Sequence, residues 1–255
     1  MSTPWLMFQL AGPMASFGEV AVGEVRGSEA VPSRSAMLGL LAAALGIRRD
    51  QDDQHSALSA AVQFAMRVES ADFRMLDFHT AQAAKRAKLK GRPLRTRRDE
   101  LQAENLSTIL SSREYHADYR ASIAVLAQEP FTPECLQRAL LAPKFMLFLG
   151  RKCSPLAWPL APSIVVAAGF QAAFAAWDVL RESQRKQWLS QGGDKPLWPF
   201  LDRHAHNYRF ETGMTWTGTE AVREVLRRDQ PISRSRWLFA QATHQRVQTA
   251  EKGAS

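Results

Sequence analysis

Two helix-like segments in the first 150 residues are each enclosed by strand-like segments, and few folds accommodate that order. In the first unit, the apolar run Trp5–Leu10 predicts a buried strand. A serine before and a glycine after the apolar segment Ala36–Leu45 are typical of a capped, buried helix. The period-two alternation of Val62–Val68 then predicts a half-buried strand.

The same order follows a second time. Tyr119–Leu126 alternates like a strand, Thr132 and Pro133 predict the start of a helix that runs through Leu141, and Lys144–Leu149 resembles a further strand. The stretch between the two units, 73–112, is polar and without clear periodicity, so we expect it to leave the core. The complete order matches the ferredoxin-like, or split βαβ, arrangement, which RNA-recognition domains also use. The predicted fold class is therefore α+β.

The remaining sequence is harder to interpret. Residues 17–31 are rich in glycine and lack periodicity, which favours a loop. Ser163–Leu189 has apolar residues near a 3.6-residue period, which predicts an amphipathic helix that ends at Gln191–Gly193. Arg236–Val247 is compatible with a late strand, and residues 194–218 support no prediction.

The positive charge of the chain is concentrated in one place. Lys85–Arg98 contains eight lysines and arginines and no acid, and the net charge of the whole chain is +8. The rest of the protein is therefore close to neutral, and a polyanion is the natural partner of the basic run. A solvated basic loop is the alternative, and composition alone does not decide between them.

Composition excludes several other classes of protein. With 45% hydrophobic and 23% charged residues, the chain is neither fibrous nor wholly disordered. Two lone cysteines and the lack of a signal-like start favour a reduced, cytoplasmic protein. The longest apolar run, Ala36–Ile47, is too short for a membrane span, which needs about 20 residues. No metal-ligand spacing and no cofactor motif occur, so we expect no metal and no cofactor.

Three short segments have the chemistry to bind a nucleic acid. Ser33, Arg34 and Ser35 stand at a predicted helix start, where free N–H groups favour a phosphate, although Ser33 alone is well explained as a cap. Arg113 and Tyr115 combine a cation with an aromatic ring where the chain returns to the core. The third segment is the cationic turn 150–155 after a predicted strand, where backbone can approach a ligand closely.

A catalytic interpretation also stays open. Metal-free RNA cleavage needs a base for the 2′-hydroxyl and cations for the phosphate, and His79 or His116 beside the basic residues could supply them. An isolated histidine is more often structural or a stacking surface for a base. A metal-independent endoribonuclease is thus an alternative to a binding subunit, and a general RNA-binding module is another.

Six short motifs occur in order over about 150 residues. They are L-A-G-P-M-A-S-F-G (Leu10–Gly18), P-S-R-S-A-M-L-G-L-L (Pro32–Leu41), L-G-I-R-R-D (Leu45–Asp50), D-F-H-T (Asp77–Thr80), S-R-E-Y (Ser112–Tyr115) and L-G-R-K-C-S-P-L (Leu149–Leu156). Together they resemble the CasD-type subunits of type I-E CRISPR Cascade complexes, which are members of the RAMP superfamily.

The resemblance implies a modified RRM-like (RAMP) fold over residues 1–160, with a basic thumb inserted at about 73–112. Residues 161–255 would pack on the same domain. Such a subunit holds the 5′ handle of the crRNA and caps the backbone (CasC-type) subunit beside the large (CasA-type) subunit, and it meets target DNA through the assembled complex. It is expected not to be an enzyme, although a sister branch in type I-C systems cleaves RNA.

The resemblance also implies which residues contact RNA. Carried over by position, they are Gly12, Pro13, Met14, Ala15, Ser16, Phe17, Ser33, Arg34, Ser35, His79, Arg113, Tyr115, Arg151, Lys152, Cys153 and Ser154. Arg95 and Arg97 are added for their charge and location, and bases are expected to stack on side chains such as Tyr115 or His79. The match fades after Leu160, and 178–205 is atypical of the family. Its Trp188, Trp198 and Phe200 are expected in the core, with a contact surface for a neighbouring subunit as the alternative.

Overall fold

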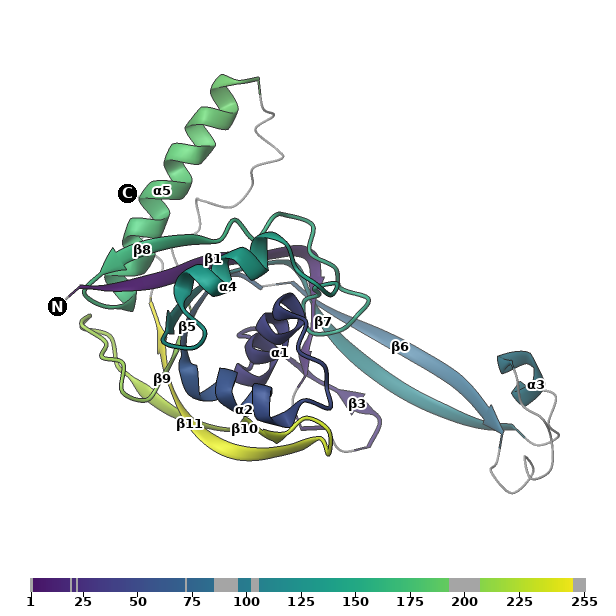
Figure 1. Ribbon diagram of the computed structural model, residues 1–255. Helices are drawn as coiled ribbons and strands as arrows, with labels where there is room; N and C mark the ends of the chain where they lie inside the picture. The colour runs from purple at the N-terminus through teal and green to yellow at the C-terminus, as the bar shows by residue number, and fades with distance from the viewer. Residues whose placement is uncertain are drawn as a thin grey trace.

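A long, mainly antiparallel sheet runs through the protein (Figure 1). The structure, a computed structural model, describes residues 2–249 apart from 19, 22, 72, 85–95, 102–105 and 193–206. Its strands are β1 (Thr3–Ala15), β2 (Phe17–Gly18), β3 (Val25–Arg26), β4 (Ser28–Glu29), β5 (Val62–Ser70), β6 (Phe73–Ala84), β7 (Leu106–Ala127), β8 (Ser163–Ala167), β9 (Asn207–Glu211), β10 (Arg223–Ser233) and β11 (Leu238–Gln248). Its helices are α1 (Arg34–Leu45), α2 (Asp52–Ala61), α3 (Arg97–Leu101), α4 (Pro133–Leu141) and α5 (Phe170–Ser190).

The centre of the sheet has the predicted ferredoxin-like arrangement. The spatial order β8-β1-β7-β5 places β7 between β1 and β5, which α1 and α2 connect. It also places β1 between β7 and β8, which α4 connects. These are the two interleaved β-α-β units of the split βαβ motif. The prediction of an α+β fold of this type is confirmed.

Both faces of the central strands are covered, and this explains the continuous apolar run near the N-terminus. Leu6 and Phe8 of β1 pack into a core with α1, α2 and α4. Trp5 and Met7 point to the opposite face, where α5 lies. Strand β5, which pairs with β7, was expected to be half-buried, but all its residues except Gln63 are buried because a helical layer covers each face.

The caps of the two predicted helices are confirmed. Ser33 precedes α1 and its hydroxyl accepts a hydrogen bond from the N–H of Ala36, while Gly46 ends the helix with a left-handed φ of 82°. Thr132 caps α4 in the same way, with Pro133 in the first turn. Each cap satisfies backbone groups that the helix itself cannot pair.

The segment 73–112, which was expected to leave the core, contains a long β-hairpin. Strands β6 and β7 pair from Phe73 opposite Ala117 to Ala84 opposite Leu106, and the β6–β7 hairpin projects from the body with α3 at its far end (Figure 1). Most residues of β6 are exposed, so no buried face imposed the apolar alternation that would have revealed this strand. Most of the basic run, Lys85–Arg95, lies outside the described residues.

The predicted strand at Lys144–Leu149 is wrong. Only Phe148 forms an isolated bridge, to Pro155, and Met146 is 73% exposed. The fourth strand of the ferredoxin-like order is instead β8, which the sequence analysis assigned to the beginning of a helix. Its residues Ile164, Val165 and Val166 are β-branched and favour a strand, and α5 begins only at Phe170.

The C-terminal strands extend the sheet past β5. Strand β9 pairs with β5, and β11 pairs with both β9 and β10, so the predicted late strand is confirmed as β11. Helix α2 and strands β9 and β10 were not predicted from the sequence, and the expected loop at 17–31 contains the short strands β2, β3 and β4. Trp188 is half-buried on α5, whereas Trp198 and Phe200 lie outside the described residues. Among the described helices, none is long and apolar enough to cross a membrane.

Candidate nucleic-acid interface

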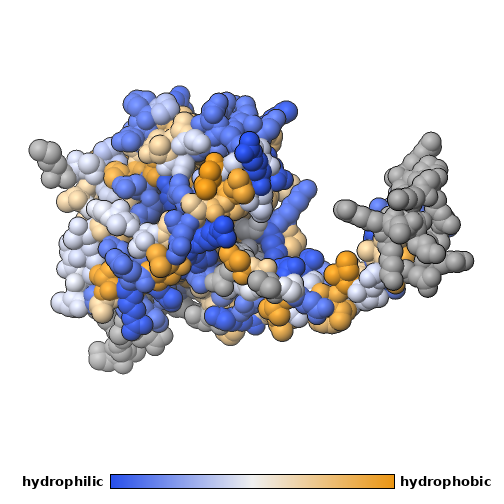
Figure 2. Space-filling model, turned by 90° about the horizontal axis from the view of Figure 1, so that it is seen from below, coloured by the Kyte–Doolittle hydropathy of each residue, from blue (hydrophilic) through white to orange (hydrophobic). Residues whose placement is uncertain are grey.

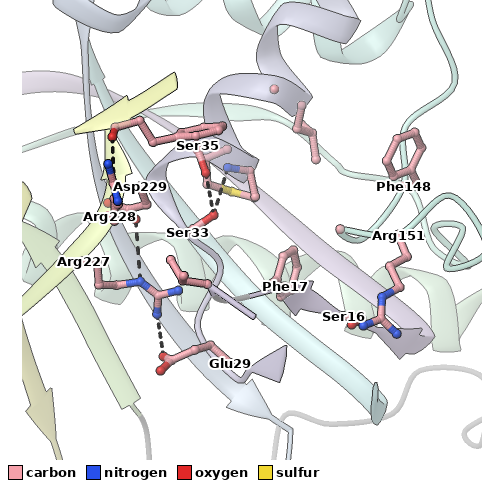
Figure 3. A pocket seen from close by; sticks show the side chains of 18 of the residues that line it. Ser16, Phe17, Glu29, Ser33, Ser35, Phe148, Arg151, Arg227, Arg228 and Asp229 are labelled. Carbon is pink, nitrogen blue, oxygen red and sulfur yellow. Dashed lines mark hydrogen bonds and ion pairs between the residues drawn. The ribbon is translucent and has the colours of Figure 1, made fainter. Parts of the chain in front are cut away.

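A groove of about 810 Å³ opens beside the start of α1 (Figure 3). Phe148 and Arg151 lie on one side of it, and Arg227 and Arg228 of β10 lie on the opposite side. We call this site the groove; its lining includes Ser16, Phe17, Gly18, Glu29, Ser33, Ser35, Phe148, Gly150, Arg151, Arg227, Arg228, Asp229, Arg234, Trp237 and Phe239. The groove therefore brings together the end of β1, the start of α1 and the turn at Gly150, each of which belongs to one of the sequence motifs quoted above.

A glycine fixes how two of these segments meet. The N–H of Ser16 donates to the carbonyl of Leu149 over 3.0 Å, which joins the end of β1 to the turn that follows. Gly150 has a φ of +82°, and a Cβ atom there would lie 1.9 Å from the carbonyl oxygen of Ser16. Only glycine tolerates both conditions. The close approach places Arg151 at the groove.

The side chain of Arg151 packs on the ring of Tyr115. Its guanidinium lies 4.7 Å from the centre of the Tyr115 ring, and its Nη2 donates to the carbonyl of Arg26 over 3.3 Å. Tyr115 is only 4% exposed, and its hydroxyl lies 3.6 Å from the sulfur of Cys153. The ring of Tyr115 therefore packs against Arg151 and is not exposed to solvent, where a base could stack on it.

The start of α1 has fewer free donors than the sequence analysis expected. The backbone N–H of Arg34 donates to Oδ2 of Asp229 over 2.9 Å, and that of Ala36 donates to Ser33. The Arg34 side chain points into the protein, where its Nε pairs with Glu211 at 2.9 Å. What α1 offers to the groove is mainly the two serine hydroxyls, Ser33 and Ser35, whose oxygens are 3.0 Å apart.

The opposite side of the groove contains arginines that were not predicted as site residues from the sequence. Arg227 pairs with Glu29 at 2.7 Å, Arg228 Nε donates to the carbonyl of Phe239 over 3.1 Å, and Arg234 donates to the carbonyl of Ser35. Burial lowers the pKa of Arg234. With Arg151, the groove lining holds four arginines against two carboxylates, so its charge is positive. The R-R pair at 227–228 and R-S-R-W at 234–237 were the available signals.

Other predicted residues lie on the β6–β7 hairpin or outside the described residues. His79 bonds to Asp77 through Nε2, and Asp77 is the register partner of Arg113. Arg97, in α3, pairs with Glu100. None of these residues lines the groove. Arg95 lies outside the described residues.

The remaining predicted contacts surround the junction of β1 with the turn. Gly12, Ala15 and Phe17 are buried, Met14 is half-buried, and Pro13 is exposed. In the turn, Lys152 and Cys153 are exposed, while Ser154 is buried and its hydroxyl has no hydrogen-bond partner within the described part of the chain.

The histidine named as an alternative base is fully enclosed. His116 is 1% exposed, and its ring nitrogens lie 2.9 Å from the carbonyl of Ala71 and 3.1 Å from that of Ser28. Both nitrogens are therefore engaged with the backbone. This environment suits a structural histidine that joins β7 to two neighbouring segments.

A second group of arginines lies under α5, on the other face of the sheet. We call it the buried ion cluster: Arg67, Glu69, Arg120, Asp178 and Arg181. Glu69 is 2.9 Å from Arg67, 2.6 Å from Arg120 and 4.0 Å from Arg181. Burial alone would raise the pKa of Glu69, but the three arginines outweigh it and lower that pKa to about 2. With three arginines against two carboxylates, the cluster is a buried and largely paired network, unlike the groove.

Comparisons with known proteins agree with this architecture. The family model described as CRISPR-associated protein (Cas5) matches residues 5–244. The chain is 34% identical over 166 residues to "CRISPR system Cascade subunit CasD" of Escherichia coli (strain K12), an alignment that covers 61% of this chain and 69% of the relative.

Solved structures have the same overall fold. One, titled "CRISPR RNA-guided surveillance complex", has a TM-score of 0.58 and 25% identity, and the match covers 97% of this chain and 90% of the other. Another, titled "Crystal structure of Cas protein", has a TM-score of 0.57 and 22% identity, covering 95% and 94% of the two chains. The family resemblance found in the sequence motifs is confirmed. The chain belongs to the CRISPR-associated Cas5 protein family.

Proposed function

We propose that this protein is the subunit of a type I-E CRISPR Cascade complex that holds the 5′ handle of the crRNA, and that it does so without cutting RNA. One observation carries the proposal: the groove joins the end of β1, the start of α1 and the turn at Gly150 in a single site rich in arginine. The relatives named as a Cascade subunit and as an RNA-guided surveillance complex give the chemical class of the ligand.

The geometry suits a single strand of RNA. Arg151 on one side of the groove and Arg228 on the other can each bond a phosphate, because arginine presents a planar fork of donors. The hydroxyls of Ser33 and Ser35 lie between them, within reach of sugars or base edges. Phosphate contacts hold the strand in place, and contacts to base edges select its sequence.

The β6–β7 hairpin is suited to meet a neighbouring protein. Apolar side chains gather along it in Figure 2, although the hairpin stands in solvent. They include Phe73, Leu76 and Phe78, each more than half exposed. Such a surface is typical of a protein contact. In this proposal the hairpin meets the backbone (CasC-type) subunit, the body lies beside the large (CasA-type) subunit, and target DNA is met through the complex.

A nuclease is the second candidate, and it depends on one observation. His79 is bonded to Asp77, with Arg113 opposite in the strand register, which resembles an oriented base beside a cation. The test is incubation of the full chain with repeat RNA in EDTA. Site-specific cleavage that His79→Ala abolishes would replace the binding proposal by catalysis, and we expect no cleavage.

The binding proposal is tested by removing groove cations. The variant with Arg151→Ala and Arg228→Ala is compared with wild type by fluorescence anisotropy on single-stranded repeat RNA. We expect weaker binding and a salt dependence flatter by about 0.7 for each phosphate that the variant no longer binds. Arg138→Ala is the control, since Arg138 is an exposed arginine of α4 outside the groove. An unchanged slope in the double variant would contradict the proposal.

A further inference from the structure

Trp237 has a backbone conformation that tryptophan normally avoids. It is the last residue of the turn between β10 and β11, and its φ is +58°. This left-handed region crowds the Cβ atom, so hairpin turns usually place glycine or asparagine there. A strained bulky residue that persists at a turn points to a role of its side chain.

The turn that contains Trp237 is held by hydrogen bonds to the carboxylate of Asp52 in α2. One carboxylate oxygen accepts the backbone N–H groups of Arg234 and Ser235 over 2.8 and 3.2 Å. The other accepts the hydroxyls of Ser233 and Ser235 over 2.7 and 2.6 Å. These four hydrogen bonds fix the conformation of the turn, so the tryptophan is set in position before any ligand arrives.

The indole itself is supported but not covered. The guanidinium of Arg49 lies 4.9 Å from the centre of the ring, and Phe239 meets it edge-on with centres 5.4 Å apart. Trp237 nevertheless stays 59% exposed and lines the groove. A rigid, half-exposed aromatic ring with a cation against it is a ready surface for another flat ring.

We propose that Trp237 is a stacking platform for one base of the RNA strand in the groove, an inference that rests on the proposed function. Sites for single-stranded RNA pair cations for the phosphates with aromatic side chains for the bases. Here Arg228 and Arg234, which line the same groove as Trp237, supply the cations. A protein ligand would explain an exposed ring equally well, but it would not explain a ring placed inside an arginine-rich groove.

The test separates stacking from structure. Trp237→Asn keeps a residue that tolerates the left-handed conformation but removes the ring, so we expect an unchanged or higher melting temperature. Its affinity for single-stranded repeat RNA, measured with the full chain, should fall about ten-fold, toward the lower end of the range for a lost base stack. Trp237→Phe retains an aromatic face and should lose much less.

A scan with RNAs that each lack one base identifies the partner. With the wild-type protein, removing the stacked base should weaken binding about ten-fold. With Trp237→Asn, removing that same base should leave the affinity unchanged. Additive losses at every position would overturn the stacking assignment.

Three results would overturn the inference, and they separate it from the proposed function. If wild type binds RNA and Trp237→Asn binds it equally well, the platform is wrong while the proposed function stands. If that variant instead loses only its association with other Cascade subunits, Trp237 contacts protein. If wild type binds no RNA, both fail.

Discussion

The groove and the buried ion cluster are both rich in arginine, yet they use it in opposite ways. In the cluster, the arginines lie around the carboxylates of Glu69 and Asp178, and every residue of the cluster except Asp178 is buried. In the groove, Arg227 pairs with Glu29, but Arg151, Arg228 and Arg234 bond to backbone carbonyls. A carbonyl orients a guanidinium but leaves its full charge, whereas a carboxylate neutralises it. We therefore expect the arginines bonded to carbonyls to contribute to binding and those paired with carboxylates to contribute to stability.

The largest expected effect comes from removing the carboxylate at the centre of the cluster. Glu69→Gln leaves Arg67, Arg120 and Arg181 buried with too little negative charge, which typically costs about 3–5 kcal/mol. Urea unfolding at pH 7 measures this loss. RNA affinity at a temperature where the variant stays folded should be unchanged. A loss below about 1 kcal/mol would mean that the cluster and the groove do not differ as described.

The same carboxylate predicts how stability depends on pH. The pKa of Glu69 is about 2 in the folded protein, below its ordinary value of 4.5, so folding favours the ionised form. Its contribution is complete above pH 4.5 and is lost as the pH falls toward 2. The difference in unfolding free energy between wild type and Glu69→Gln should shrink across this range. A difference that is constant from pH 6 to about pH 3 would contradict the assignment.

A smaller effect is expected from the basic run, which continues into α3. Replacing Arg95, Arg97 and Arg98 by alanine should weaken binding of repeat RNA and flatten its salt dependence by about 0.7 for each phosphate released from the protein. Arg185→Ala with Lys186→Ala removes two charges from α5 instead and is the control. If the slope does not change, the basic run is solvated, and the groove alone supplies the cations.

The smallest effect concerns the start of α1. Ser33→Ala removes the side-chain cap on the N–H of Ala36 and should cost about 1 kcal/mol in thermal or urea unfolding. Ser35→Ala removes a neighbouring hydroxyl that is not the cap and should change stability by less than about 0.5 kcal/mol. Equal losses would show that the Ser33 hydroxyl does not stabilise the protein as a helix cap.

Local signals in the sequence were sufficient wherever neighbouring residues decide the structure. The caps at Ser33 and Thr132 were predicted because each is satisfied by the helix that it begins. The exchange of Lys144–Leu149 for β8 was not predictable in this way, since both segments are short and apolar and only pairing with β1 decides between them. The β6–β7 hairpin was missed as strands because it has no buried face.

The candidate site was predictable only on one side. The end of β1, the start of α1 and the turn at Gly150 carry family motifs, and the groove brings them together. The opposite side depends on β10 and β11 reaching the body through β9, a pairing between residues far apart in the sequence. Nothing local to Arg228 or Trp237 announces where that pairing places them.

Strand β7 has a mechanical consequence. It is assigned as one strand of 22 residues, but Asp118 within it has a left-handed φ of +49°, which makes the strand irregular where the hairpin joins the centre of the sheet. On the hairpin side of this residue, Glu114 receives a backbone N–H from Ser28 and its carbonyl receives the hydroxyl of Ser16, over 3.0 and 2.8 Å. Because Ser16 lines the groove, a force on the hairpin reaches the groove wall through Glu114.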